Sequence, residues 1–542
     1  LATVAAMIPE EQFQVQRIID LNIEPLTDEQ IKNSDLISIS SMIIQEDSRN
    51  EIIDRVHFYG KKVIDGGPFP TSYPERTSNA DYRICGEAEI TLKPFLEDLL
   101  KGVAKKEYTE EEIIKQGRCQ VELTRERKPE LSQTPIPRWD LIDLNAYNSV
   151  AIQYSRGCPR DCEFCDIRKL FGGIPRTKTN EQMLAEIQRV YDLSYTGSIF
   201  IVDDNFIGNK KNVDKLLPEI IKWQKQHNYP FSFFTEAGMD LAWSNYRNTL
   251  EMMVKAGFDE VFLGIESIDE DVLEKMGKKQ NIKINPFDAV RIIQNLGLKV
   301  SGGFIIGSDG EKPTVFDNIY QFIQDAGIPI AMPGLLGVLK GTKLYKRLER
   351  EGRLREGVSG DNTHRFQFNF QPEMDEEFLI NGYKELIKKL YTPKNYYKRC
   401  ITLQENLGKK EHKQKRLNMT GIIAFGKSLI KILPSKGGFQ YAKYLGRTLL
   451  TNPKYIPEAV TDAIKLKHFN TITKASLEVD EYSTRIKTLY ERFLRKTEEG
   501  KDYAEKILKK AERQYQKLHK DFRNRANQTI EDLRNKINSY RK

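Results

Sequence analysis

Three of the six cysteines in the chain lie within eight positions, at Cys158, Cys162 and Cys165. A thiolate is a soft metal ligand, and gaps of three and then two residues allow one loop to wrap three sulfurs around a single metal centre. Such a centre keeps a coordination position free, where a substrate can bind. The motif follows an apolar run at residues 150–152, so we expect the cysteines in the loop after a strand.

Three kinds of site could use these sulfurs. A structural zinc site normally closes its tetrahedron with a fourth Cys or His, but all six histidines lie more than fifty residues from the motif. A disulfide framework needs an oxidising compartment, and six cysteines in 542 residues are too few for one. The third is an iron-sulfur cluster with one open iron, which the residues downstream favour.

Six strand-like runs between residues 150 and 340 are predicted to position this loop. Helical periodicity follows all but the last of them, which indicates a curved parallel barrel or partial barrel. Polar residues stand at the carboxyl end of nearly every run, and in such a barrel those ends share one mouth. We therefore expect acids and glycines to converge on one ligand that carries an amine and hydroxyls, as S-adenosylmethionine (SAM) does. The runs are residues 150–153, 198–202, 231–235, 260–264, 299–306 and 328–332.

With the aromatic Phe164 directly before its last cysteine, the motif resembles the signature loop of the radical SAM superfamily. The resemblance implies a 4Fe-4S cluster on Cys158, Cys162 and Cys165, with SAM on the open iron. It also implies an electron donor such as flavodoxin or ferredoxin. The SAM contacts that it implies are Phe164, Asp203, Asp204, Asn205, Glu236, Glu266, Gly303 and Gly307.

Several segments are similar to the cobalamin-dependent group of this superfamily that contains the hopanoid methylases. The similarity implies cleavage of SAM to a 5′-deoxyadenosyl radical and methyl transfer to an unactivated carbon. One turn departs from the group, because residues 339–342 read Leu-Lys-Gly-Thr where Pro-Pro-Gly-Thr is usual. That turn lies on the substrate side, so a hydrophobic polycyclic lipid, a tetrapyrrole and other secondary metabolites all stay open as substrates. The similar segments are residues 158–178, 202–211, 234–237 and 359–362.

Alternating strand and helix signals over residues 1–105 predict a parallel, Rossmann-like sheet before the barrel. Strands are expected at residues 14–20, 35–40, 62–65 and 81–85, with helices at 49–59 and 88–101. By resemblance this is a cobalamin-binding domain, cut short at its N-terminus, so the loop that in many cobalamin proteins supplies a histidine to cobalt would precede residue 1. Ligands bind at the carboxyl ends of such strands, here at Ser41, Met42, Gly66, Gly67 and Pro68.

Composition and charge set the remaining expectations. With 39% hydrophobic and 30% charged residues and no apolar run of membrane-spanning length, the chain is typical of a soluble protein, and its sparse cysteines favour the cytoplasm. We expect a linker at 106–149, the barrel at 150–340, a substrate-side extension at 341–410 and a basic helical region at 411–542. The last region is expected to be a solvated face or to contact a membrane surface, and its charge accompanies no nucleic-acid motif.

Three other functions are weighed against a methyltransferase. A tRNA methylthiotransferase would need three more N-terminal cysteines, and only Cys85 and Cys119 precede the motif. A radical SAM cyclase or rearrangement enzyme would cleave SAM without transferring a methyl group. A non-catalytic cobalamin-binding or metal-binding module would not need acids on successive strand ends.

Overall fold

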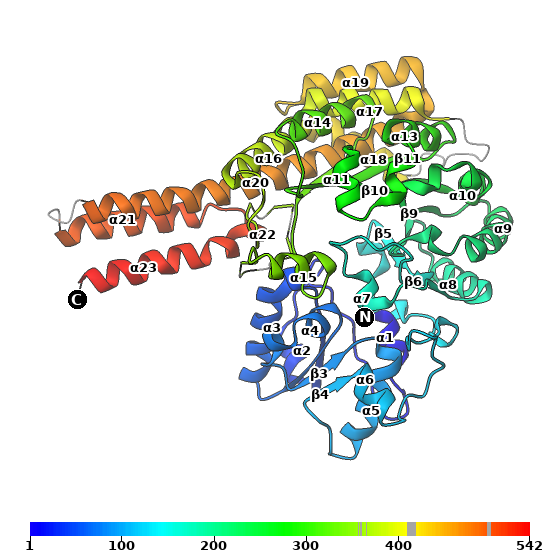
Figure 1. Cartoon of the computed structure of the whole chain (residues 1–542), viewed down its shortest axis with the longest axis horizontal. Coiled ribbons are helices and arrows are strands. Elements are labelled where there is room, and N and C mark those ends of the chain that lie inside the picture. Colours follow the sequence, from blue (N-terminus) through cyan, green and yellow to red (C-terminus); the bar gives the residue numbers. More distant parts are fainter. Residues whose placement is uncertain are drawn as a thin grey trace.

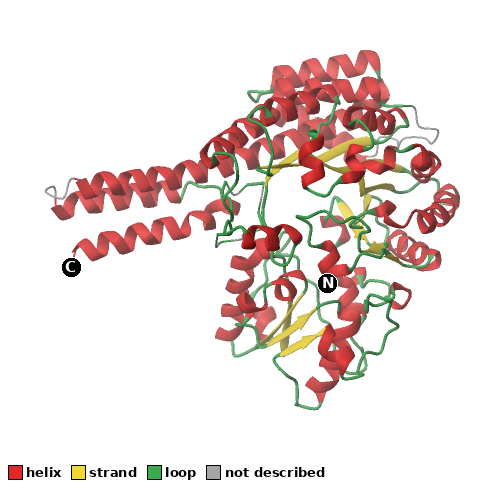
Figure 2. Cartoon of the chain, viewed as in Figure 1, coloured by secondary structure: helices red, strands yellow, loops and turns green. Residues whose placement is uncertain are grey.

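The computed structural model describes residues 1–355, 357, 360, 361, 363, 364, 366–408, 419–495 and 500–541. An N-terminal domain with a small sheet lies below a larger curved sheet, and helices extend from the far side of that sheet into a projecting arm (Figures 1 and 2). The predicted α/β class, with a Rossmann-like domain, a partial barrel and a helical C-terminal region, is confirmed.

The central sheet has six parallel strands in the order β12-β11-β10-β9-β8-β5, with β5 and β12 as its two edges. Each predicted run overlaps its strand, because an apolar run flanked by turns marks a buried parallel strand. The strands are β5 (Ser149–Ile152), β8 (Ser198–Ile201), β9 (Ser232–Gly238), β10 (Phe258–Glu266), β11 (Lys299–Ile306) and β12 (Ala331–Leu335). The helices of the barrel are α8 (Asn180–Asp192), α9 (Lys210–Gln226), α10 (Arg247–Ala256), α11 (Glu270–Lys275), α12 (Lys279–Ile282), α13 (Pro286–Asn295) and α14 (Val315–Asp325).

The N-terminal domain has four parallel strands in consecutive order. The prediction of a strand at residues 14–20 is wrong. This segment pairs with none of the described strands, and Ile18 donates its backbone N–H to the carbonyl of Leu141. A capping box from Thr27 to Gln30 does begin α2. The elements are β1 (Leu36–Ser40), β2 (Lys62–Gly66), β3 (Tyr82–Cys85), β4 (Glu107–Thr109), α1 (Ala2–Ala6), α2 (Asp28–Lys32), α3 (Glu46–Phe58), α4 (Pro68–Ser72), α5 (Ala88–Leu100) and α6 (Glu110–Lys115).

Helices after the barrel cover its β12 edge and then form the arm. Tyr383 and Tyr391 donate hydroxyl hydrogen bonds to two backbone carbonyls within β12, which fixes α16 against the sheet. None of the described helices is long and apolar enough to cross a membrane. The side chains of Tyr490 and Phe493, expected on a helical face, lie outside the described residues, as do Ser359 and Asn362. The helices are α15 (Lys343–Arg350), α16 (Glu376–Leu390), α17 (Pro393–Asn406), α18 (Met419–Ile432), α19 (Gly438–Thr451), α20 (Ile456–Arg495), α21 (Gly500–Tyr515), α22 (Lys520–Arg523) and α23 (Asn527–Arg541).

Candidate active site

The three cysteines lie in the loop after β5, between the short strand β6 (Ser155–Arg156) and the helix α7 (Ile167–Phe171). β6 pairs in antiparallel fashion with β7 (Arg176–Thr177), a hairpin that the sequence did not reveal. A turn from the barrel supports the loop from the other side, where Glu163 donates its backbone N–H to Met276. Gly277 has a φ of +73°, and a Cβ there would lie 3.1 Å from the carbonyl oxygen of Asp161. Close packing therefore fixes the loop at the barrel mouth.

The cysteine thiols are partly buried and close enough to influence one another. Burial raises the pKa of each, and that of Cys165 rises to about 12, with the charges of Cys162 and Cys158 adding to the rise. Within the described part of the chain, no three His, Cys, Asp or Glu side chains are grouped as ligands of one metal ion. A 4Fe-4S cluster bound to these sulfurs would hold them as thiolates, against the rise in pKa that burial causes.

Three polar residues follow β8, and each of them contacts the cysteine loop or the residues just before it. Asp203 is buried, with one carboxylate oxygen 2.8 Å from the backbone nitrogen of Tyr154 and the other 2.7 Å from the Ser155 hydroxyl. Asp204 accepts a hydrogen bond from the backbone nitrogen of Gly157 at 3.0 Å. Asn205 places its side-chain nitrogen 3.9 Å from the Cys158 sulfur, and its buried Oδ1 has no hydrogen-bond partner among the described residues. Both carboxylate oxygens of Asp203 thus accept hydrogen bonds from the loop, whereas the Oδ1 of Asn205 could accept one from a ligand.

Two further acids approach the mouth from β9 and β10. The pKa of Glu236 is raised by burial and then by the charges of Asp204 and Glu266, and no ion pair of Glu236 occurs within the described residues. Glu266 has a φ of +62° and forms an ion pair with Lys278 at 2.5 Å. Lys278 also donates to the carbonyl of Gly264 at 2.7 Å. The structure therefore brings Asp204, Glu236 and Glu266 together, as expected from their strand ends.

The glycines predicted on β11 take two different roles. A Cβ on Gly303 would lie 3.1 Å from the ring of Phe262, so a side chain there would crowd the strand. Gly307 has a φ of +99°, and its N–H donates to Glu311 at 2.8 Å. Burial raises the pKa of Glu311 to about 7, and its other carboxylate oxygen has no hydrogen-bond partner in the described chain. Sequence reasoning missed Glu311, although it stands only four residues after the turn glycine.

Phe164, the remaining predicted SAM contact, lies partly buried in the cysteine loop and packs against the barrel core. The ring is therefore held next to the sulfur ligands rather than in solvent.

A cavity of about 190 Å³ opens at the carboxyl ends of β1, β2 and β3. Gly66, Gly67 and Pro68 line it, together with Arg156 and Phe171 from the cysteine-loop side. Gly67 has a φ of +97°, and a Cβ there would lie 2.7 Å from the Ser40 hydroxyl. Of the other two residues predicted to contact cobalamin, neither lines the cavity. Ser41 is buried with an unpartnered hydroxyl, and Met42 is 56% exposed.

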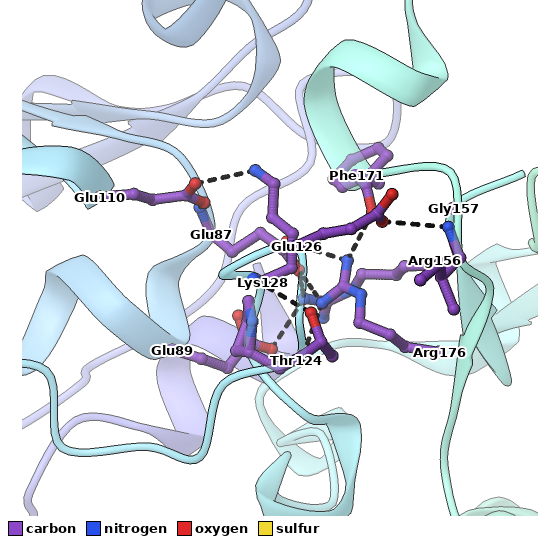
Figure 3. Close-up of polar contacts among 12 residues, drawn as sticks. Glu87, Glu89, Glu110, Thr124, Glu126, Lys128, Arg156, Gly157, Phe171 and Arg176 are labelled. Atoms are coloured by element: carbon purple, nitrogen blue, oxygen red, sulfur yellow. Dashed lines mark hydrogen bonds and ion pairs between the residues drawn. The ribbon is translucent and has the colours of Figure 1, made fainter. Parts of the chain in front are cut away.

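Buried ion pairs join this cavity to the cysteine loop (Figure 3). Glu87, at the start of α5, pairs with Arg156 at 2.7 Å and with Arg176 at 2.9 Å, so it binds both strands of the hairpin. Arg156 also reaches Glu89 at 2.9 Å, and Arg176 donates to the carbonyl of Pro129 at 2.6 Å. We call Glu87, Glu89, Arg156 and Arg176 the interdomain charge cluster.

Known proteins resemble most of the chain. Residues 152–323 match the radical SAM superfamily, and residues 342–482 match a domain of unknown function, DUF4070. An uncharacterized methyltransferase of Synechocystis sp. is 42% identical over 402 residues, covering 74% of this chain and 71% of the relative. The hopanoid C-2 methylase of Rhodopseudomonas palustris is 34% identical over 399 residues, covering 74% and 72%. The solved methyltransferase TsrM from Kitasatospora setae aligns with 82% of this chain and 90% of its own, at 14% identity and a TM-score of 0.49.

A three-cysteine loop at the mouth of a six-stranded parallel partial barrel defines the class, which is that of the radical SAM enzymes. The two relatives above 30% identity place the chain more narrowly within this class. The chain belongs to the radical SAM family, in the group that includes the hopanoid C-2 methylase.

Proposed function

We propose that the protein cleaves SAM reductively at the cysteine loop and transfers a methyl group to an unactivated carbon of a small substrate. The observation that supports this most directly is the set of acids on successive strand ends, Asp204, Glu236 and Glu266, beside three thiols in one loop. A metal-binding module that only stores a cofactor needs no such acids.

The thiols of Cys158, Cys162 and Cys165 would hold a 4Fe-4S cluster, and the unpartnered Asn205 Oδ1 is the kind of acceptor that a bound SAM amine requires. When bound, such a cluster passes one electron to SAM and releases a 5′-deoxyadenosyl radical. Glu236 and Glu266 carry negative charge toward the mouth, where they would attract the cationic sulfonium and amine and accept ribose hydroxyls. The buried walls keep water from the radical.

Cobalamin would lie at the N-terminal cavity. Gly66, Gly67 and Pro68 would lie against it. A cavity of about 190 Å³ is smaller than the 300–1,000 Å³ typical for drug-sized ligands. It would therefore admit only part of this cofactor. When bound, cobalamin supplies the methyl group for transfer.

Three further properties belong to the proposal. The electron comes from a small redox protein such as flavodoxin or ferredoxin. The substrate is hydrophobic and lipid-like, a class suggested by the hopanoid C-2 methylase, although the Leu-Lys-Gly-Thr turn at residues 339–342 keeps the exact compound open. The protein is cytoplasmic and contacts a membrane surface peripherally through its C-terminal helices.

The test is an anaerobic incubation of reconstituted protein with SAM, a reductant, cobalamin and a candidate lipid. We expect 5′-deoxyadenosine and S-adenosylhomocysteine to appear together. Deoxyadenosine alone would favour a cyclase or rearrangement enzyme. If neither product formed, the chain would be a non-catalytic binding module.

Two cysteine variants make the test specific. Cys165→Ala should abolish formation of deoxyadenosine, because it removes one sulfur ligand. Cys85→Ala is the matched control: it deletes a buried thiol that lies in β3, away from the loop, and should retain product formation. Equal loss of deoxyadenosine formation in both variants would mean that the cysteine loop has no special role in the reaction.

A further inference from the structure

Large apolar side chains are exposed together on α18, α19 and the turn between them. The most exposed are Ile430 at 76%, Phe439 at 78% and Leu450 at 86%, and Ile423, Leu433 and Leu449 are also exposed. Isolated exposed apolar residues are normal on a protein surface, but several of them along one side of a helix indicate an interaction site. We call this group the α18–α19 face. Helix α19 lies at the outer edge of the molecule, on the opposite side from the N-terminal domain (Figure 1).

The opposite side of α19 is buried, which explains why its apolar residues are exposed on one side. On α19, Tyr441, Tyr444 and Thr448 are buried and turn toward the rest of the molecule. Tyr441 exchanges a hydrogen bond with Ser428 of α18 at 2.8 Å, which holds the two helices together. Phe439 and Leu450 are eleven positions apart, or three helical turns, so they project from the same side of α19. The exposed residues therefore lie on the outward sides of two helices whose buried sides are linked by this hydrogen bond.

The charge of the face is predominantly positive. Residues 419–451 include five basic side chains and no acidic one, and one of the five, Arg447, pairs with Glu405 of α17. Lys443 lies between Phe439 and Leu450 on the exposed side, and Lys427 lies between Ile423 and Ile430 on α18. Apolar side chains thus alternate with lysines along both helices.

We propose that the α18–α19 face binds the surface of an anionic lipid bilayer. An amphipathic helix with lysines between its apolar residues lies in the interface of a bilayer, with its apolar side chains in the acyl boundary and its ammonium groups at the headgroups. Anionic headgroups match the excess of positive charge. A protein partner or a second copy of this chain would have to pair these interspersed lysines in a dry contact, where an unpaired charge is costly. A second copy presents the same positive charge.

This inference deepens the membrane contact of the proposed function, but it requires neither SAM cleavage nor a particular substrate. It is tested by flotation of the full chain with vesicles of phosphatidylcholine alone or with about a third of phosphatidylglycerol. We expect binding to the anionic vesicles, weak binding to the neutral ones, and release by high salt, since ions screen the headgroup charge.

Matched variants distinguish binding through this face from nonspecific binding to vesicles. Phe439→Ser should weaken partition onto anionic vesicles about tenfold, and Lys443→Glu at least about fivefold. Phe58→Ser is the control for the first, because Phe58 is 81% exposed on α3 in the N-terminal domain. Lys101→Glu, an exposed lysine next to α5 in the same domain, is the control for the second. Both controls should bind vesicles as the wild type does.

Three results would overturn the inference. The first is wild-type protein that does not float with anionic vesicles, and the second is equal loss in Phe58→Ser and Phe439→Ser. The third is a dimer in analytical ultracentrifugation that Phe439→Ser dissociates while vesicle binding stays unchanged, which would assign the face to a second copy. Far-ultraviolet circular dichroism and thermal unfolding of each variant establish that it is folded. Formation of deoxyadenosine is measured separately, so failure of membrane binding and failure of the chemistry are distinguishable.

Discussion

Two groups of buried charge flank the cysteine loop, and they differ in how their charges are paired. In the interdomain charge cluster, Glu87 contacts Arg156 and Arg176, and both arginines have further acceptors. At the barrel mouth, Glu236 and Glu266 lie near each other, and Lys278 pairs with Glu266 alone among the described residues. One group is balanced by the protein itself, whereas the other retains excess negative charge.

The difference indicates which group stabilises the fold and which one is kept for a ligand. A buried carboxylate costs free energy unless a cation and hydrogen bonds compensate for its lost hydration. The chain provides that compensation for Glu87. For Glu236, a bound cation such as SAM would provide it. Removing one carboxylate from the interdomain charge cluster should therefore lower the free energy of unfolding. Removing one from the barrel mouth should weaken ligand binding and leave the fold intact.

The largest effect on stability is expected from Glu87→Gln. It leaves Arg176 without its carboxylate in a buried site and Arg156 with Glu89 alone, and breaking such a pair typically costs about 3–5 kcal/mol. Urea unfolding should show the loss. Glu112→Gln is the control, since it removes an exposed pair with Lys105 and should cost less than about 1 kcal/mol. Similar midpoints for the two variants would contradict the structural role of the interdomain charge cluster.

Glu236→Gln should weaken ligand binding and spare the fold. A hydrogen bond to a charged group is worth about 1.5–3 kcal/mol, so we expect SAM affinity to fall about 10–100-fold. The free energy of unfolding without SAM should stay the same or rise, because the change removes a carboxylate close to Asp204 and Glu266. Equilibrium dialysis and urea unfolding measure the two quantities. A variant that unfolds more easily but binds SAM normally would reverse the comparison.

The sequence predicted the mouth better than the interdomain charge cluster, and the reason is physical. Strand ends, the cysteine spacing and the acids after β8 and near the ends of β9 and β10 are local signals, so Asp204, Glu236 and Glu266 could be grouped without coordinates. The pairing of Glu87 with Arg176 joins residues 89 positions apart. No local periodicity encodes such a contact.

Local signals also failed in two other places. The segment at residues 14–20 has the composition of a strand, but a strand also needs a neighbour with which to exchange hydrogen bonds. Glu311 was missed because its significance depends on the fold of the turn, which aims the N–H of Gly307 at its carboxylate. In both cases the decisive partner is set by tertiary structure.

The smallest expected effect is the pH dependence of stability that Asp203 causes. It is also the sharpest test of a buried carboxylate that is held by hydrogen bonds instead of by a cation. Burial raises its pKa to about 7, although Ser155 and Tyr154 donate hydrogen bonds to it. In the unfolded chain its pKa is about 3.9. Between these values the native state holds a proton that the unfolded state has lost, so this residue's contribution to stability declines as pH rises through the window and is constant above it.

Asp203→Asn has no such proton. Urea unfolding from pH 5 to 8 should therefore show wild type losing stability relative to this variant. Asp98→Asn is the control: hydrogen bonds from Arg118 lower the pKa of Asp98, so its contribution is lost only as pH falls below this range. Wild type and Asp203→Asn curves that stay parallel would mean that the Asp203 carboxylate is already ionised at pH 5.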